Sequence, residues 1–184
     1  MAKFTIDGYG QIELNNASFL RDGGVEAQSK ISPVDFEDPG YAENGMVLQL
    51  NGPERMLEKP VADSGFPLVV LYTSESAGLY ENHLTGLKNH KNDITGFYPR
   101  AGHPRMGDKW TTNCFGYGDG IADDEAAVTA IKAAKDTPLY AVPGAEGYIE
   151  LTTTAPTEGL AFRVIKPHTM PDGQFAIQVQ VISI

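Results

Sequence analysis

The C-terminal stretch QFAIQVQVISI constrains the fold more than any other part of the chain. From residue 175 to residue 181, large apolar side chains at odd positions alternate with an alanine and two glutamines. Side chains that alternate with a period of two lie on opposite faces of a β-strand, so one face is predicted to be buried and the other partly wet. The polar face also turns apolar at Ile182 and Ile184.

Other short apolar runs separated by turn residues extend this β pattern along the chain. GLAFRVI before the terminal strand predicts a hairpin whose connection, residues 166–173, holds two prolines and an Asp-Gly pair. Further strands are predicted at residues 4–6, 12–14, 46–50 and 67–73, and on either side of the Pro-Gly turn in PLYAVPGAEGYIELTTT.

The number of turn residues supports a fold made of many short strands. The 184 residues include 20 glycines and 12 prolines, which is above the usual share but below that of low-complexity sequence. We therefore expect a mainly β, mostly antiparallel fold, a sandwich or a partly open barrel, with one short helix or helical excursion. Residues 1–184 are predicted to form a single domain with an irregular acidic loop region around 31–60.

The stretch TTNCFGYGDGIADDEAAVTAIKAAK, residues 111–135, is typical of a strand, a glycine-rich turn and a helix. Its glycines are spaced G-x-G-x-G, which departs from the G-x-G-x-x-G of dinucleotide sites. Four acids, Asp119, Asp123, Asp124 and Glu125, would occupy the place of a ligand's phosphates. Because carboxylates cap helix N-termini, we interpret the stretch as a capped helix rather than a nucleotide site.

Metal and catalytic sites find little support in the sequence. The acids of residues 119–125 do not fit a calcium-binding EF-hand loop, although a cation site formed with other loops stays open. His83 and His90 are seven residues apart, which does not suit two ligands on one helix. Cys114 is predicted to be a small core residue, and no hydrolase, metalloprotease or phosphate-loop motif is present. We expect no catalytic residues, no metal and no cofactor.

The charge distribution limits the kinds of molecule that this chain is expected to bind. A formal net charge of −10 disfavours nucleic acid as a partner, because phosphate binding depends on Lys and Arg. There is no run of eighteen apolar residues and no secretory signal at the N-terminus, and Cys114 is the single cysteine. We expect a chain made in the cytoplasm that has no membrane partner. Residues 83–109 carry five Lys or Arg and two Asp, a local balance of +3.

Two phrases of the chain resemble small virion proteins of tailed bacteriophages. They are YPRAGHPRMGDKWTTNCF, which contains P-R-x-G-D-x-x-T-T-N at residues 104–113, and EGLAFRVIKPHTMPDGQFAIQVQVI. The group is that of head or capsid decoration proteins. The resemblance implies a non-enzymatic protein that attaches to the outer face of the assembled capsid. Its partner would be the major capsid protein. Whether the chain also associates with further copies of itself stays open.

The +3 segment is the predicted contact with that partner, since it would orient an otherwise acidic molecule toward an acidic surface. The expected partner-binding residues are Phe97, Tyr98, Arg100, Arg105, Lys109 and Trp110.

Two other functions are compatible with the sequence. A carbohydrate-binding module would use exposed aromatics as stacking platforms, the candidates being Tyr80, Tyr98, Tyr117 and Trp110. An acidic mimic of nucleic acid would need a continuous acidic face, and the +3 segment argues against it.

Overall fold

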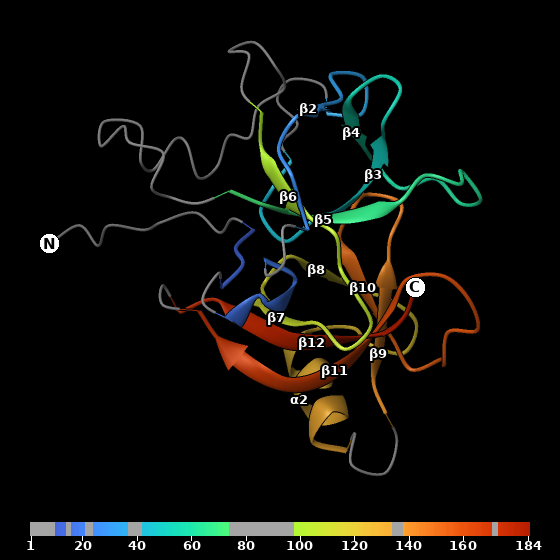
Figure 1. Cartoon of the computed structure of the whole chain (residues 1–184). Coiled ribbons are helices and arrows are strands. Elements are labelled where there is room, and N and C mark those ends of the chain that lie inside the picture. Colours follow the sequence, from blue (N-terminus) through green and yellow to red (C-terminus); the bar gives the residue numbers. More distant parts are fainter. Residues whose placement is uncertain are drawn as a thin grey trace, which may run out of the picture.

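The computed structural model describes residues 10–13, 16–20, 24–36, 42–73, 98–133, 138–170 and 173–184. Within these ranges the chain is mainly β, as predicted: twelve strands form two six-stranded sheets. The helical elements are α2 (Asp124–Ala133) and the 3-10 turn η2 (Ser18–Leu20). Figure 1 shows one sheet above the other, with α2 beneath the lower sheet.

The upper sheet is built from strands between residues 25 and 102. Its strands, in spatial order, are β1 (Val25–Glu26), β6 (Arg100–Gly102), β5 (Leu68–Tyr72), β3 (Val47–Asn51), β4 (Met56–Glu58) and β2 (Lys30–Ile31). Every neighbouring pair is antiparallel except β2 and β4, which are parallel. The predicted irregular region around 31–60 therefore contains β4 in addition to the strand expected near residues 46–50.

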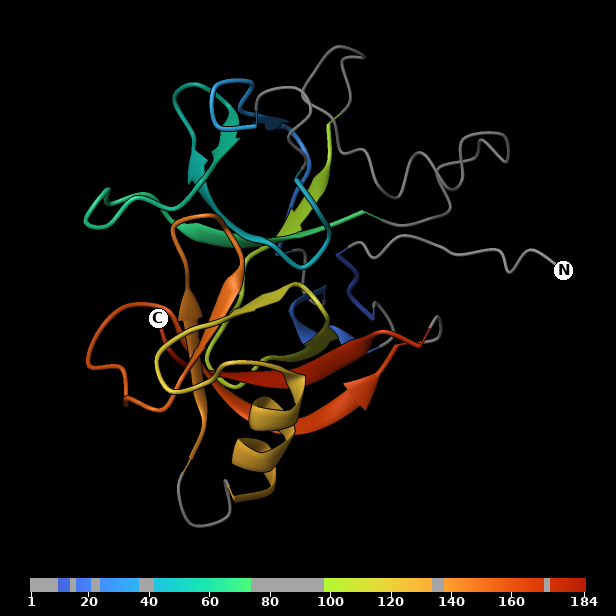
Figure 2. The ribbon, with the colours of Figure 1, turned by 180° about the vertical axis from the view of Figure 1, so that it is seen from behind.

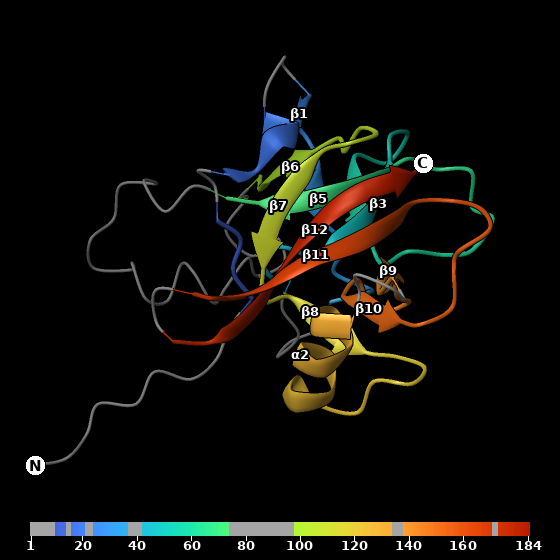
Figure 3. The ribbon, with the colours of Figure 1, turned by 90° about the horizontal axis from the view of Figure 1, so that it is seen from below.

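The lower sheet is built from the C-terminal half. Its order is β7 (Lys109–Thr112), β12 (Phe175–Ser183), β11 (Ala161–Thr169), β9 (Tyr140–Pro143), β10 (Ile149–Thr152) and β8 (Phe115–Tyr117). Only β8 and β10 are parallel. The two hairpins predicted nearest the C-terminus, β9 with β10 and β11 with β12, are both present, whereas the strand predicted at residues 4–6 lies outside the described residues. Figure 3 shows β11 and β12 running side by side as the longest pair.

Both sheets curl, because very short connections join their opposite edges. β7 and β8 lie at the two edges of the lower sheet, yet only Asn113 and Cys114 separate them in the chain. In the upper sheet, the edge strands β1 and β2 are joined by residues 27–29 alone. The edges are not paired across these gaps, so neither sheet in the described chain closes into a barrel, and the two sheets are consistent with the predicted β-sandwich.

Strands β3 and β5 form a wall that both hydrophobic cores share. Val47 and Val70 face the core of the lower sheet, whereas Leu48 and Leu71 face the core of the upper sheet. A strand covered on both faces is apolar throughout, which explains the continuous run LVVLY in β5. The expectation of a single domain stays a prediction, although this shared wall joins the two halves.

Strand β11 is longer than the sequence suggested. The expected connection began at Lys166, but β11 continues through Pro167 to Thr169. Beyond Val164, whose N–H donates to the carbonyl of Leu139, β11 is paired with β12 alone. A proline without an N–H is tolerated on an edge of this kind.

The helix α2 begins as the sequence predicted. The side chain of Asp123 accepts a hydrogen bond from the N–H of Ala126 at 2.8 Å, which is the geometry of an N-cap. Ala127 and Ile131 of α2 are buried in the core of the lower sheet, on the side away from the upper sheet (Figure 2). No helix in the described ranges is long and apolar enough to cross a membrane.

Candidate functional site

The predicted contact segment links the two sheets. Its described part, residues 98–109, contains β6 of the upper sheet and runs into β7 of the lower one. Residues 83–97, including Phe97, lie outside the described residues. The candidate site can therefore be built from Tyr98, Arg100, Arg105 and Lys109, together with what surrounds them.

Tyr98 and Arg100 lie at the start of β6. The ring of Tyr98 is 46% exposed, and the ammonium of Lys30 lies 5.4 Å from its centre, within cation–π range. Arg100 is exposed and pairs in register with Tyr72 of β5. The ring of Tyr98 and the ammonium of Lys30 thus lie together on this part of the surface, while Arg100 interacts with the side chain of Tyr72.

A tight turn holds Arg105 and Lys109 at the other end of the segment. The N–H of Arg105 donates to Oδ2 of the buried Asp108 at 2.8 Å, and Asp108 also accepts from the hydroxyl of Ser18. The N–H of Gly107 donates to the carbonyl of Val181 on β12 at 3.0 Å. The turn is therefore fixed to the lower sheet, and it presents Met106, which is 63% exposed.

Trp110 does not belong to this surface, which corrects the sequence prediction. Its side chain is fully buried and packs edge to face against Phe19 and Phe162, each at 5.2 Å between ring centres. The cause is strand alternation: Lys109 of β7 points outward, so Trp110 points inward, opposite Val179 of β12. A fully buried ring serves neither as a partner anchor nor as a sugar platform.

The remaining aromatic candidates differ in their surroundings. Tyr117 is 43% exposed, but its hydroxyl donates a hydrogen bond to Asp124 of α2. Burial, and then Asp124 and Asp123, raise the pKa of Tyr117 to about 12. Tyr80 lies outside the described residues.

Cys114 is buried, as predicted. It lies in the connection between β7 and β8 and packs into the core of the upper sheet. Burial, and secondarily the negative charge of Glu43, raise the pKa of its thiol well above the ordinary value. A buried thiol that stays protonated is a poor nucleophile.

The two histidines that the structure describes lie on different elements: His168 is on β11, and His103 directly follows β6. Nε2 of His168 lies 2.8 Å from Oε1 of Glu13, so this pair connects β11 to the N-terminal segment. His83 and His90 lie outside the described residues. Within the part of the chain that the structure describes, no three side chains of His, Cys, Asp and Glu are grouped so that they could hold a metal ion.

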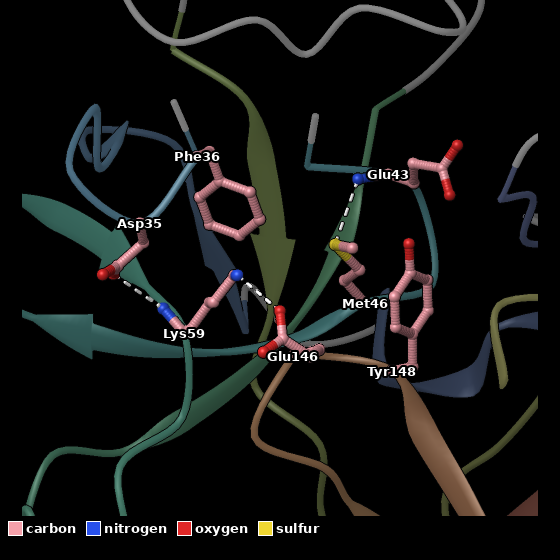
Figure 4. A pocket seen from close by; sticks show the side chains of 7 residues that line it. All are labelled: Asp35, Phe36, Glu43, Met46, Lys59, Glu146 and Tyr148. Atoms are coloured by element: carbon pink, nitrogen blue, oxygen red, sulfur yellow. Dashed lines mark hydrogen bonds and ion pairs between the residues drawn. The ribbon is translucent and has the colours of Figure 1, made fainter. Parts of the chain in front are cut away.

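A pocket that sequence reasoning missed lies between the two sheets (Figure 4). Its volume is about 310 Å³. Seven side chains line it: Asp35, Phe36, Glu43, Met46, Lys59, Glu146 and Tyr148. The first five come from segments next to β2, β3 and β4, and the last two from the turn between β9 and β10. Four separate segments meet here, so no local motif in the sequence marks the pocket.

Lys59 crosses the pocket from one sheet to the other. Its backbone N–H donates to Oδ2 of Asp35 at 3.0 Å, and its ammonium lies 2.5 Å from Oε2 of Glu146. The ammonium also lies 5.6 Å from the ring centre of Phe36. Figure 4 shows Phe36 and Tyr148 on either side of Met46.

Comparison with known proteins finds no relative of this chain. No protein-family model matches it, and neither curated proteins nor solved structures give a match.

Proposed function

We propose that this chain is a non-enzymatic virion protein that binds the outer surface of an assembled bacteriophage capsid and stabilises it. One observation carries the proposal: the two phrases that resemble capsid decoration proteins lie side by side in the fold. β7, from the first phrase, pairs with β12, from the second, with Trp110 opposite Val179. The turn that precedes β7 is hydrogen-bonded to Val181. The two phrases therefore meet in the lower sheet through β7 and β12, which supports the proposal.

The contact face follows from the exposed side chains of residues 98–109. Tyr98 and Met106 are exposed apolar groups, and they take the anchoring role that the sequence assigned in part to Trp110. Arg100 follows Tyr98 two residues along the chain, Arg105 and Lys109 lie on either side of Met106 in sequence, and all three bases are exposed. Each exposed ion pair to an acidic capsid surface adds only about 0.2 to 1 kcal/mol, so the apolar anchors supply most of the affinity and the charges supply orientation.

Co-sedimentation with undecorated heads of the phage that encodes the chain tests this proposal. The wild type is expected to pellet with the heads, and a variant with Arg100, Arg105 and Lys109 changed to Ser is expected to bind more weakly and with a shallower salt dependence. A matched control changes three exposed bases on α2 and β11, Lys132, Arg163 and Lys166, to Ser.

The possible outcomes distinguish two questions: whether the chain binds capsids, and whether residues 98–109 form the contact. If the wild type does not bind heads, the capsid function is wrong. If the first triple variant binds like the control across the salt titration, the capsid function stands and the contact face lies elsewhere. Binding to glycans without binding to heads would favour the carbohydrate-binding alternative.

A further inference from the structure

The pocket between the sheets has the composition of a cation site. Three of its seven side chains are carboxylates, Asp35, Glu43 and Glu146, and one is an ammonium, Lys59, which leaves a formal charge of −2. The aromatic rings of Phe36 and Tyr148 and the thioether of Met46 form the rest of the lining. Carboxylates beside aromatic faces are the groups with which proteins bind organic cations.

The pocket already holds one ammonium group. Lys59 lies over the ring of Phe36 and contacts Glu146, so both kinds of cation contact are made by a group of this chain. The side chain of Glu146 is 68% exposed and that of Lys59 is 29% exposed, so the ion pair is open to solvent on the side of the glutamate and is weaker than a buried pair. A second ammonium can therefore displace the ammonium of Lys59 from the pocket or bind beside it.

Tyr148 adds a neutral donor and an aromatic face to the pocket wall. Burial, and then the negative charges of nearby acids, chiefly Glu43, raise its pKa to about 12. Its hydroxyl stays protonated at neutral pH, and the acids around it create a field that favours positive charge.

We propose that this pocket binds an alkylammonium group. The ammonium lies against the carboxylate of Glu146 and the aromatic rings, and the alkyl stem lies along Met46. The volume of about 310 Å³ suits a small group of this size. Two sources carry this chemistry, a lysine side chain of a protein partner and a free amine. The pocket shares no residue with the contact face of residues 98–109, so the inference stands independently of the capsid function.

Titration with n-butylammonium, followed by heteronuclear NMR, tests the site, and n-butanol serves as the neutral ligand of the same shape. Butylammonium is expected to give saturable shifts at the lining residues, while butanol gives none that saturate. The change Glu146→Gln is expected to weaken binding about threefold to fivefold. Glu158→Gln removes an equal charge beyond the far end of β10 and is expected to leave binding unchanged. Lys59→Met removes the lysine ammonium from the pocket and retains a side chain of similar length. This variant is therefore expected to bind butylammonium severalfold more tightly.

Three results would overturn the proposal: no saturable shift in either the wild type or Lys59→Met, equal shifts from butanol, or equal affinities in the Glu146 and Glu158 variants. A second arm identifies the source. If acetyl-Gly-Lys-Gly-amide binds at the same residues and its norleucine counterpart does not, a protein lysine is the ligand. If butylammonium binds and the lysine peptide does not, the ligand is a free amine.

Discussion

At the scale of single residues, Gly45 controls how closely the upper sheet approaches the connection between β7 and β8. Its φ is +95°, and a Cβ at this position would lie 2.3 Å from Oγ1 of Thr112 and 2.7 Å from Cβ of Cys114. Thr112 cannot move aside freely, because its hydroxyl donates to the carbonyl of Gln11 and accepts from the N–H of Cys114. Backbone conformation and space both require glycine here.

We therefore expect Gly45→Ala to lower the free energy of unfolding by more than about 2 kcal/mol, as measured by urea denaturation. The control is Gly65→Ala, since Gly65 also has a positive φ, +71°, but open space around it. The free energy of unfolding of that variant should fall by only about 1 kcal/mol, because only backbone strain is added. Equal losses in the two variants would mean that the clash at Thr112 is relieved without cost.

Ile177 and Gln178 test the sidedness of β12. Ile177 is fully buried in the core of the lower sheet, whereas Gln178 is partly exposed. Replacing Ile177 by Asp should cost several kcal/mol, because it buries an unpaired charge, while Gln178→Asp should cost less than about 1 kcal/mol. The measurement is the midpoint of thermal or urea unfolding for both variants. Similar losses would show that the second face of β12 is also covered.

Burial of individual residues could be predicted only where a pattern was long enough. The alternation from residue 175 to residue 181 places Ile177 correctly, and Cys114 is assigned to the core because TTNCFG is interpreted as a strand. Trp110 was misplaced because β7 has only four residues, Lys109–Thr112, and two of them are threonines. Their polarity hid the alternation that turns Trp110 inward.

At the scale of elements, the cap of α2 makes a measurable contribution. Asp123 accepts a hydrogen bond from the N–H of Ala126, one of the donors that a helix leaves unpaired at its start. We expect Asp123→Ala to lower the free energy of unfolding by about 0.5 to 2 kcal/mol. The control Asp119→Ala removes the same charge from the exposed turn before the helix and should have little effect. A loss in the control as large as that in Asp123→Ala would point to charge rather than capping.

Elements with strong local signals were predictable, and those fixed by tertiary pairing were not. The apolar run of β5 and the hairpins of β9 to β12 carry their own pattern and turn residues. β1 and β2 have two residues each and β6 has three, which is too short for any periodicity. Their places depend on partners that lie far away in the chain, as when Val25 pairs with Gly102. The pocket was hidden for the same reason, since Lys59 and Glu146 meet only after both sheets have formed.

At the scale of the whole molecule, two curled sheets that share the wall of β3 and β5 give a body in which each half covers the other's apolar surface. Val47 of the upper sheet donates its N–H to the carbonyl of Gly147 in the lower half at 2.8 Å, and Lys59 reaches across to Glu146. The segment of residues 98–109 crosses from one sheet to the other and is held at both ends. If this segment is the contact face, as proposed, its fixed backbone would lower the entropy lost on association with a large surface.

The most direct test of the proposed function is the thermal denaturation of undecorated phage heads, followed by calorimetry with and without the protein. A protein that binds the assembled shell and not its unfolded subunits must stabilise the shell by mass action. The predicted result is a denaturation temperature that rises with added protein and levels off at a fixed ratio of protein to capsid subunits. An unchanged denaturation temperature at saturating protein would contradict the role as a capsid-stabilising virion protein.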